Sequence, residues 1–111
     1  MQMPPIKFAI IDTNILLCLG LQHLICDLLP TAEILVYRSV DELLEHDSEE
    51  IKHYFVSSRV FFEHSQFFRT NPKKTIVLVN GDMTIRDMNT LNICQDEKAV
   101  VRDMMHLQSK G

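Results

Sequence analysis

The sequence predicts an α/β fold, a five-stranded doubly wound parallel sheet formed by one domain over residues 1–111. Two observations predict it. Apolar runs such as Lys7-Phe8-Ala9-Ile10-Ile11 are continuous rather than alternating, which is typical of strands buried on both faces. Segments with helical spacing separate these runs, and strands that alternate with helices pair in parallel through right-handed crossovers. The length of 111 residues corresponds to a single core.

Clear start and stop signals mark the elements of the first half of the chain. We expect a strand over 7–11, a helix that Asn14 caps and Pro30 ends, and a strand over 32–37. Ser39 caps a short helix over 40–46, and its predicted apolar stripe consists of Val40, Leu43 and Leu44. The acid-rich stretch 41–50 predicts a solvated surface.

The second half predicts three more strands, with little helix between them. We expect a strand over 53–57, a packed turn or short helix over the aromatic-rich segment 60–68, and a strand over 75–79. Residues 81–89 are too few and too polar for a helix with its loops, and a weak strand follows over 91–93. A helix over 97–108 closes the chain, with its inner side predicted to contain Val100, Val101, Met104 and Leu107.

Charge and cysteine content exclude several function classes. A net charge of -4 argues against an isolated nucleic-acid-binding module, so DNA contact would need a separate domain. Three cysteines without a C-x-x-C spacing fit reduced thiols; we expect Cys18 and Cys26 to pack in the core and Cys94 to do the same. No signal peptide or membrane span is evident, so we expect a cytoplasmic protein without membrane contact.

Polar residues follow the predicted strands at their carboxyl ends, where open parallel sheets form their functional crevice. Asp12 and Thr13 come after the first strand, Ser58 after the third (Ser57 if the register moves by one), Asn80 after the fourth and Cys94 after the fifth. We therefore expect these side chains to share one edge of the sheet.

With this element order, the chain resembles the receiver domain of two-component response regulators, particularly the LuxR/NarL type. The best local match starts at Ile10-Ile11-Asp12, with Gly20-Leu21 eight and nine residues after the acid. The resemblance implies a flavodoxin- or CheY-like fold, and the short connections imply that the third and fourth helices are shortened or missing. It also implies that a parent transcriptional regulator would carry a separate C-terminal DNA-binding domain.

The resemblance implies a site that has lost its chemistry. Receivers hold Mg²⁺ with two acids after the first strand, phosphorylate an aspartate after the third, and bind the phosphoryl oxygens with a hydroxyl and a lysine. The matching positions here are Asp12, Thr13, Ser58 (or Ser57), Asn80 and Cys94. One carboxylate is too little charge to hold Mg²⁺. We expect a pseudo-receiver that is not phosphorylated, is not an enzyme, takes no cofactor and signals by dimerisation or by binding an unknown ligand.

A nuclease is the alternative. Ile11-Asp12-Thr13-Asn14 also looks like the opening of a PIN-domain ribonuclease, in which clustered carboxylates hold the metal that activates water. That hypothesis makes Asp12, Glu42 and Asp82 the metal ligands. Against it, Glu42 also fits a solvent-facing helix charge.

Two further groups of residues have competing interpretations. The aromatic cluster of Phe61, Phe62, Phe67 and Phe68 could stack on bases, but core or interface packing is favoured. Soft side chains on the last helix, Met104, Met105 and Leu107, could face a second copy or another domain rather than the sheet. The five histidines show no paired spacing and predict no metal site.

Overall fold

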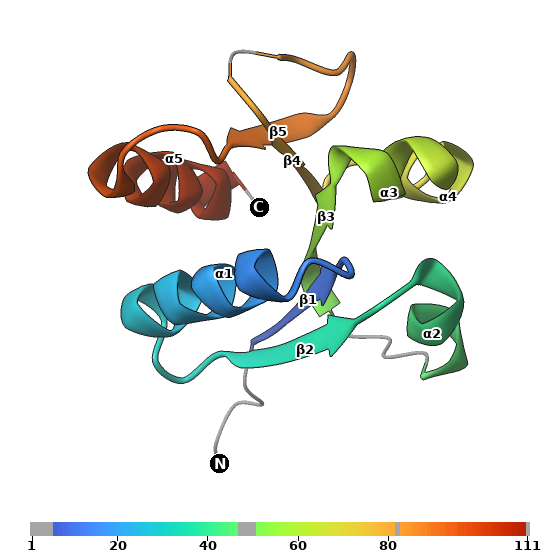
Figure 1. Cartoon of the computed structure of the whole chain (residues 1–111), viewed down its shortest axis with the longest axis horizontal. Coiled ribbons are helices and arrows are strands. Elements are labelled where there is room, and N and C mark those ends of the chain that lie inside the picture. Colours follow the sequence, from blue (N-terminus) through green and yellow to red (C-terminus); the bar gives the residue numbers. More distant parts are fainter. Residues whose placement is uncertain (1–5, 47–50, 82, 111) are drawn as a thin grey trace.

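A computed structural model describes residues 6–46, 51–81 and 83–110 of the chain. Residues 109 and 110 are described without their side chains. The described residues form five helices and five strands, and the strands make one sheet. Figure 1 shows how they are arranged. In chain order they are β1 Lys7–Ile11, α1 Ile15–Leu28, β2 Glu33–Tyr37, α2 Val40–Glu45, β3 Ile51–Ser57, α3 Ser58–Glu63, α4 Ser65–Arg69, β4 Thr75–Val79, β5 Asn89–Asn92 and α5 Glu97–Lys110.

The sheet has the strand order β2-β1-β3-β4-β5, and every neighbouring pair is parallel. The order reverses between β1 and β3, which is the arrangement of a doubly wound α/β sheet. The predicted five-stranded parallel fold is therefore confirmed. Three strand starts differ from the prediction, and β2 differs only by one residue, since it begins at Glu33. β3 begins two residues earlier, where Ile51 pairs with Lys7 across a bulge, and β5 begins at Asn89, which pairs with Ile76.

The shortened connections are also confirmed. Between β3 and β4 the chain forms only α3 and α4, of six and five residues. Between β4 and β5 the described residues 80–81 and 83–88 contain no helix. Side-chain caps explain the starts of α1 and α2, since the side chain of Asn14 accepts from the Leu17 amide and that of Ser39 from the Glu42 amide.

Helices cover both faces of the sheet, as Figure 1 shows. Alternate residues of a strand point to opposite faces, so Phe8 and Ile10 join a core with α1 and α5, and Ala9 and Ile11 join a core with α2, α3 and α4. All four are fully buried. This explains why β1 is a continuous apolar run.

The aromatic cluster is mainly core. Phe61 and Phe68 are fully buried and Phe67 packs against the same core, which confirms packing over base stacking for these three. Phe62 differs, because it is 58% exposed.

Three predictions of burial were wrong, two of them because of helical rotation. Cys18 is buried but Cys26 is exposed, since eight residues turn a helix about 80° past two full turns. Leu44 is exposed because it lies about 100° around the helix from the buried Leu43. Cys94 is also exposed, because it follows β5 at the edge of the sheet.

The predicted partner-facing surface of α5 needs a similar correction. Met104 and Leu107 are 2% and 8% exposed, because their spacing from Val100 places them on the side that packs on the sheet. They confirm the alternative prediction of an inner side. Met105 is 58% exposed and is the member of the three that still faces outward.

Candidate functional site

The carboxyl edge of the sheet brings the predicted site residues to one side of the molecule. Ile11 of β1 pairs with Val56 of β3, so the next residues, Asp12 and Ser57, lie at the same level. Asn80 follows β4 directly, and Cys94 lies two residues beyond the end of β5. The parallel sheet therefore collects residues that are far apart in the sequence, as predicted.

Asp12 is the buried acid of this edge. The residue is 6% exposed, and its amide donates to the Tyr37 carbonyl at 3.1 Å. Its carboxylate oxygen Oδ1 accepts from the Thr13 amide at 2.8 Å. The carboxylate is thus held at the end of β1 by its own turn.

A guanidinium group occupies the outer side of this carboxylate. Arg59, in the first turn of α3, places Nη2 3.4 Å from Asp12 Oδ1 and 3.2 Å from Thr13 Oγ1. Its Nη1 lies 3.7 Å from a carboxylate oxygen of Glu63, one helical turn further on. Because a guanidinium stays protonated at all ordinary pH values, a permanent positive charge lies at the mouth of the Asp12 site.

Arg59 was missed by sequence reasoning, which treated it only as a base near the aromatic cluster. Its position two residues after the end of β3 was the available signal, because a helix that starts directly at a strand end directs its first turn along the sheet edge.

The two serines have different structural roles. Ser57 ends β3 and caps α3, its hydroxyl oxygen accepting from the Val60 amide at 3.3 Å. Ser58 is the first residue of α3. Neither position supplies a carboxylate beside Asp12.

A second group of contacts ties β4 to β5. The side-chain oxygen of Asn92 accepts from the amides of Gly81 and Cys94, at 2.9 and 2.8 Å. The Cys94 thiol lies 3.3 Å from Asn80 Oδ1, so it donates to that oxygen. Gly81 has a φ of 80°, which favours glycine at this turn. Asn92 was also missed, and it serves the turn rather than a ligand.

The thiol of Cys18 lies close to the backbone of Asp12. Cys18 is a buried residue of α1, and its Sγ lies 3.8 Å from the Asp12 carbonyl oxygen. Burial raises the pKa of this thiol, and the negative charge of Asp12 raises it further. Such a cysteine stays protonated and neutral.

The ribonuclease alternative is not supported. Within the described ranges, no three His, Cys, Asp or Glu side chains are grouped as a metal site would need. Asp12 contacts Arg59 instead, and Glu42 lies in the first turn of α2. Asp82, the third proposed ligand, lies outside the described residues.

The strand order β2-β1-β3-β4-β5 and the helices on both faces of the sheet define a doubly wound α/β domain with the flavodoxin- or CheY-like fold. The chain is similar to the crystal structure of a response regulator receiver domain protein from Bacillus halodurans C-125, with a TM-score of 0.71 and 14% sequence identity. The match covers 94% of this chain and 97% of that one. At this identity the likeness establishes the fold.

No protein-family model and no curated protein matches the sequence. In the part of the chain that the structure describes, no helix is both long and apolar enough to span a bilayer.

Proposed function

We propose that this chain is a regulatory receiver domain that acts without phosphorylation, in a transcriptional regulator of the LuxR/NarL type. The ion pair between Arg59 and the buried Asp12 is the observation that carries the proposal. It puts a fixed cation against the one acid that remains of the Mg²⁺ site that the receiver resemblance implies.

The replacement of each group supports the same conclusion. A lone carboxylate that is already paired with a guanidinium has little affinity for Mg²⁺, which binds through carboxylates and keeps much of its water shell. A serine without a neighbouring base is a weak nucleophile, and Ser57 already accepts a hydrogen bond as a helix cap. Asn80 and Cys94 contact each other and supply no positive charge for phosphoryl oxygens.

Phosphorylation chemistry can be tested directly. The protein is incubated with acetyl phosphate and Mg²⁺, and intact mass spectrometry is used to detect added phosphoryl groups. We expect none. The matched control is a rebuilt site that combines Arg59→Ala, Thr13→Asp, Asn80→Thr and Cys94→Lys with Ser57→Asp or, separately, Ser58→Asp.

A rebuilt variant that gains a Mg²⁺-dependent phosphoryl group would show that the fold is competent and that the native residues prevent the reaction. Phosphorylation of the wild-type chain on either serine would contradict the proposal.

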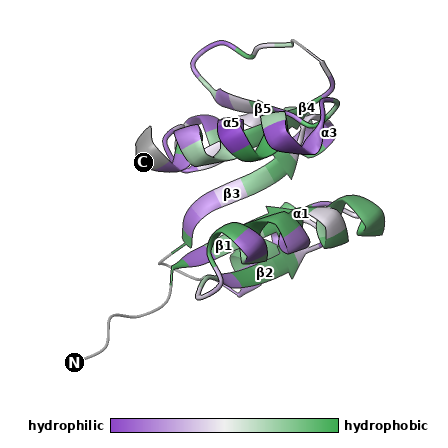
Figure 2. Cartoon of the chain, turned by 90° about the vertical axis from the view of Figure 1, so that its left-hand side faces the viewer, coloured by the Kyte–Doolittle hydropathy of each residue, from purple (hydrophilic) through white to green (hydrophobic). Residues whose placement is uncertain are grey.

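We also propose that the output of the domain is self-association, with DNA contacted only through a separate domain. Three large side chains on the first half of α1 are exposed, namely Ile15 at 64%, Leu16 at 78% and Leu19 at 54%. Figure 2 shows α1 coloured hydrophobic over much of its length. A surface helix normally has a polar outer side, so this exposed apolar surface fits a contact with a second copy.

Light scattering at high micromolar concentration tests this contact. We expect a concentration-dependent dimer that Leu16→Glu disrupts, whereas Leu44→Glu, at an exposed leucine on α2, leaves it intact. A monomeric wild type would contradict self-association and leave the phosphorylation test unaffected.

A further inference from the structure

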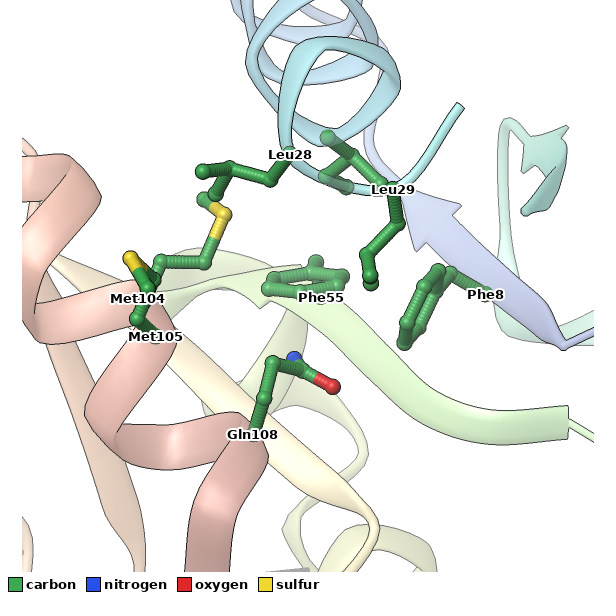
Figure 3. A pocket seen from close by; sticks show the side chains of 8 residues that line it. Phe8, Leu28, Leu29, Phe55, Met104, Met105 and Gln108 are labelled. Atoms are coloured by element: carbon green, nitrogen blue, oxygen red, sulfur yellow. The ribbon is translucent and has the colours of Figure 1, made fainter. Parts of the chain in front are cut away.

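The two helices on one face of the sheet leave an apolar cavity between them. α1 follows β1 and crosses to β2, and α5 returns from the edge strand β5, so the central strand β3 lies between the regions that they cover. The cavity has a volume of about 330 Å³. Its floor is Phe55 of β3 together with Phe8 of β1, and the end of α1 contributes Leu28 and Leu29 (Figure 3).

The wall that α5 contributes contains one polar group. Met104 and Met105 line the cavity beside Gln108. The Gln108 oxygen Oε1 is buried from solvent and has no hydrogen-bond partner among the described residues. Figure 3 shows its amide end directed toward the phenyl rings of Phe55 and Phe8. A buried acceptor without a donor is unfavourable, because it has lost its hydrogen bonds to water.

We propose that this cavity binds a small, uncharged amphiphile with an apolar body and one hydroxyl or N–H donor, which bonds to Gln108 Oε1 when a rotation of the carboxamide about its last side-chain bond turns this shielded oxygen into the cavity. Its size fits, because a cavity of about 150 Å³ lined by apolar side chains binds benzene, and twice that volume holds roughly a dozen non-hydrogen atoms. Among the described residues that line it, none is charged, so an ionic ligand would lose its hydration without compensation.

The two methionines suit such a site. Their unbranched, polarizable side chains adapt to ligands of different shape. Met104 is buried at 2% exposure and Met105 is 58% exposed, so the pair extends from the core to the surface. Because the site lies between the helices and not at the strand edge, binding would supply an input that does not need phosphorylation chemistry.

The experiment uses 1-octanol as the probe and 1-fluorooctane as a probe of the same length without the donor. Methyl groups of ¹³C-labelled methionines report binding by NMR. We expect saturable shifts at Met104 and Met105 with a sub-millimolar dissociation constant. Met88 packs against the opposite face and is the internal reference.

Two variants locate the site. Gln108→Leu removes the acceptor, and we expect it to weaken 1-octanol about tenfold while 1-fluorooctane binds as before. Leu28→Trp fills the cavity, and we expect it to abolish binding of both probes. Leu44→Trp, at an exposed leucine of α2 that lies in neither the cavity nor the proposed self-association surface, is the matched control and should bind like the wild type.

The proposal would be overturned by the absence of saturable shifts at Met104 and Met105, or by binding that persists in Leu28→Trp when that variant remains folded. Equal weakening of both probes by Gln108→Leu would overturn the hydrogen bond to Oε1. None of these outcomes depends on whether the chain accepts a phosphoryl group.

Discussion

The guanidinium of Arg59 lies 3.4 Å from the carboxylate of Asp12, although 47 positions separate the two residues in the chain. One partner is buried and the other is largely exposed, with side-chain exposures of 7% and 59%. This contact connects the end of β1 to the start of α3. It places the positive charge of the Arg59 guanidinium at the carboxyl edge of the sheet.

Removal of that guanidinium should destabilise the chain only modestly. We expect Arg59→Ala to lower the free energy of unfolding by about 1 kcal/mol, because solvent screens the exposed partner while the buried carboxylate loses a donor. Urea unfolding at low and high salt measures it. The control is Glu63→Ala, which removes only an exposed i,i+4 pair and should cost about 0.5 kcal/mol or less. Equal effects of the two substitutions would show that burial of Asp12 gives the pair no extra strength.

The buried imidazole of His53 should make stability depend on pH. His53 is 2% exposed and stacks on Phe8 with ring centroids 5.9 Å apart. Burial lowers its pKa and the charge of Lys52 lowers it further, while the Lys74 carbonyl partly offsets them. Below the ordinary histidine pKa of about 6.5 the unfolded chain takes up a proton that the folded chain does not. Stability is therefore complete above that pH and falls as the pH drops toward the folded-state pKa.

The slope of this loss is about 1.4 kcal/mol per pH unit while only the unfolded state is protonated. His53→Phe keeps an aromatic ring beside Phe8 and should remove this part of the pH dependence between pH 7.5 and 5, as urea unfolding at the two pH values would show. The control is His23→Gln, at a side chain that is 73% exposed, which should retain it. A wild-type curve that is equally steep in His53→Phe would contradict the assignment.

Two adjacent phenylalanines should differ strongly in their contribution to stability. Phe61 is fully buried, whereas Phe62 is 58% exposed and contacts Phe61 edge-on at 5.2 Å. We expect Phe61→Ala to cost about 3–5 kcal/mol and Phe62→Ala about 1 kcal/mol. Chemical denaturation of the pair measures both. Similar losses would mean that Phe62 is covered in solution, by a second copy or another surface.

Thiol reactivity should separate the three cysteines. Cys26 and Cys94 are exposed, and Cys18 is buried with a raised pKa. We expect two thiols to react quickly with a disulfide reagent in the native state and the third only on unfolding, because the thiolate is the reactive form. The raised pKa of Cys18 should keep the third thiol slow in native protein when the pH is raised moderately. Fast reaction of a third thiol in native protein that carries Cys26→Ser and Cys94→Ser would contradict the burial of Cys18.

Much of this protein could be predicted from local patterns in its sequence. The order of strands and helices, the caps at Asn14 and Ser39, and the parallel sheet follow from apolar runs and spacing. The edge location of Asp12, Asn80 and Cys94 then follows from the topology. These features were predictable because hydrogen bonding within an element and burial of its apolar face act over a few neighbouring residues.

Only the tertiary structure decided which side chains contact each other and which face solvent. The pairing of Arg59 with Asp12, the outward direction of Cys26 and Leu44, and the cavity with Gln108 in its wall all depend on how each helix is rotated and placed on the sheet. A rotation of one residue, about 100°, exchanges a buried side chain for an exposed one. The rotation of each helix on the sheet is set by packing between segments that are distant in the chain. The spacing of residues along one segment does not determine it.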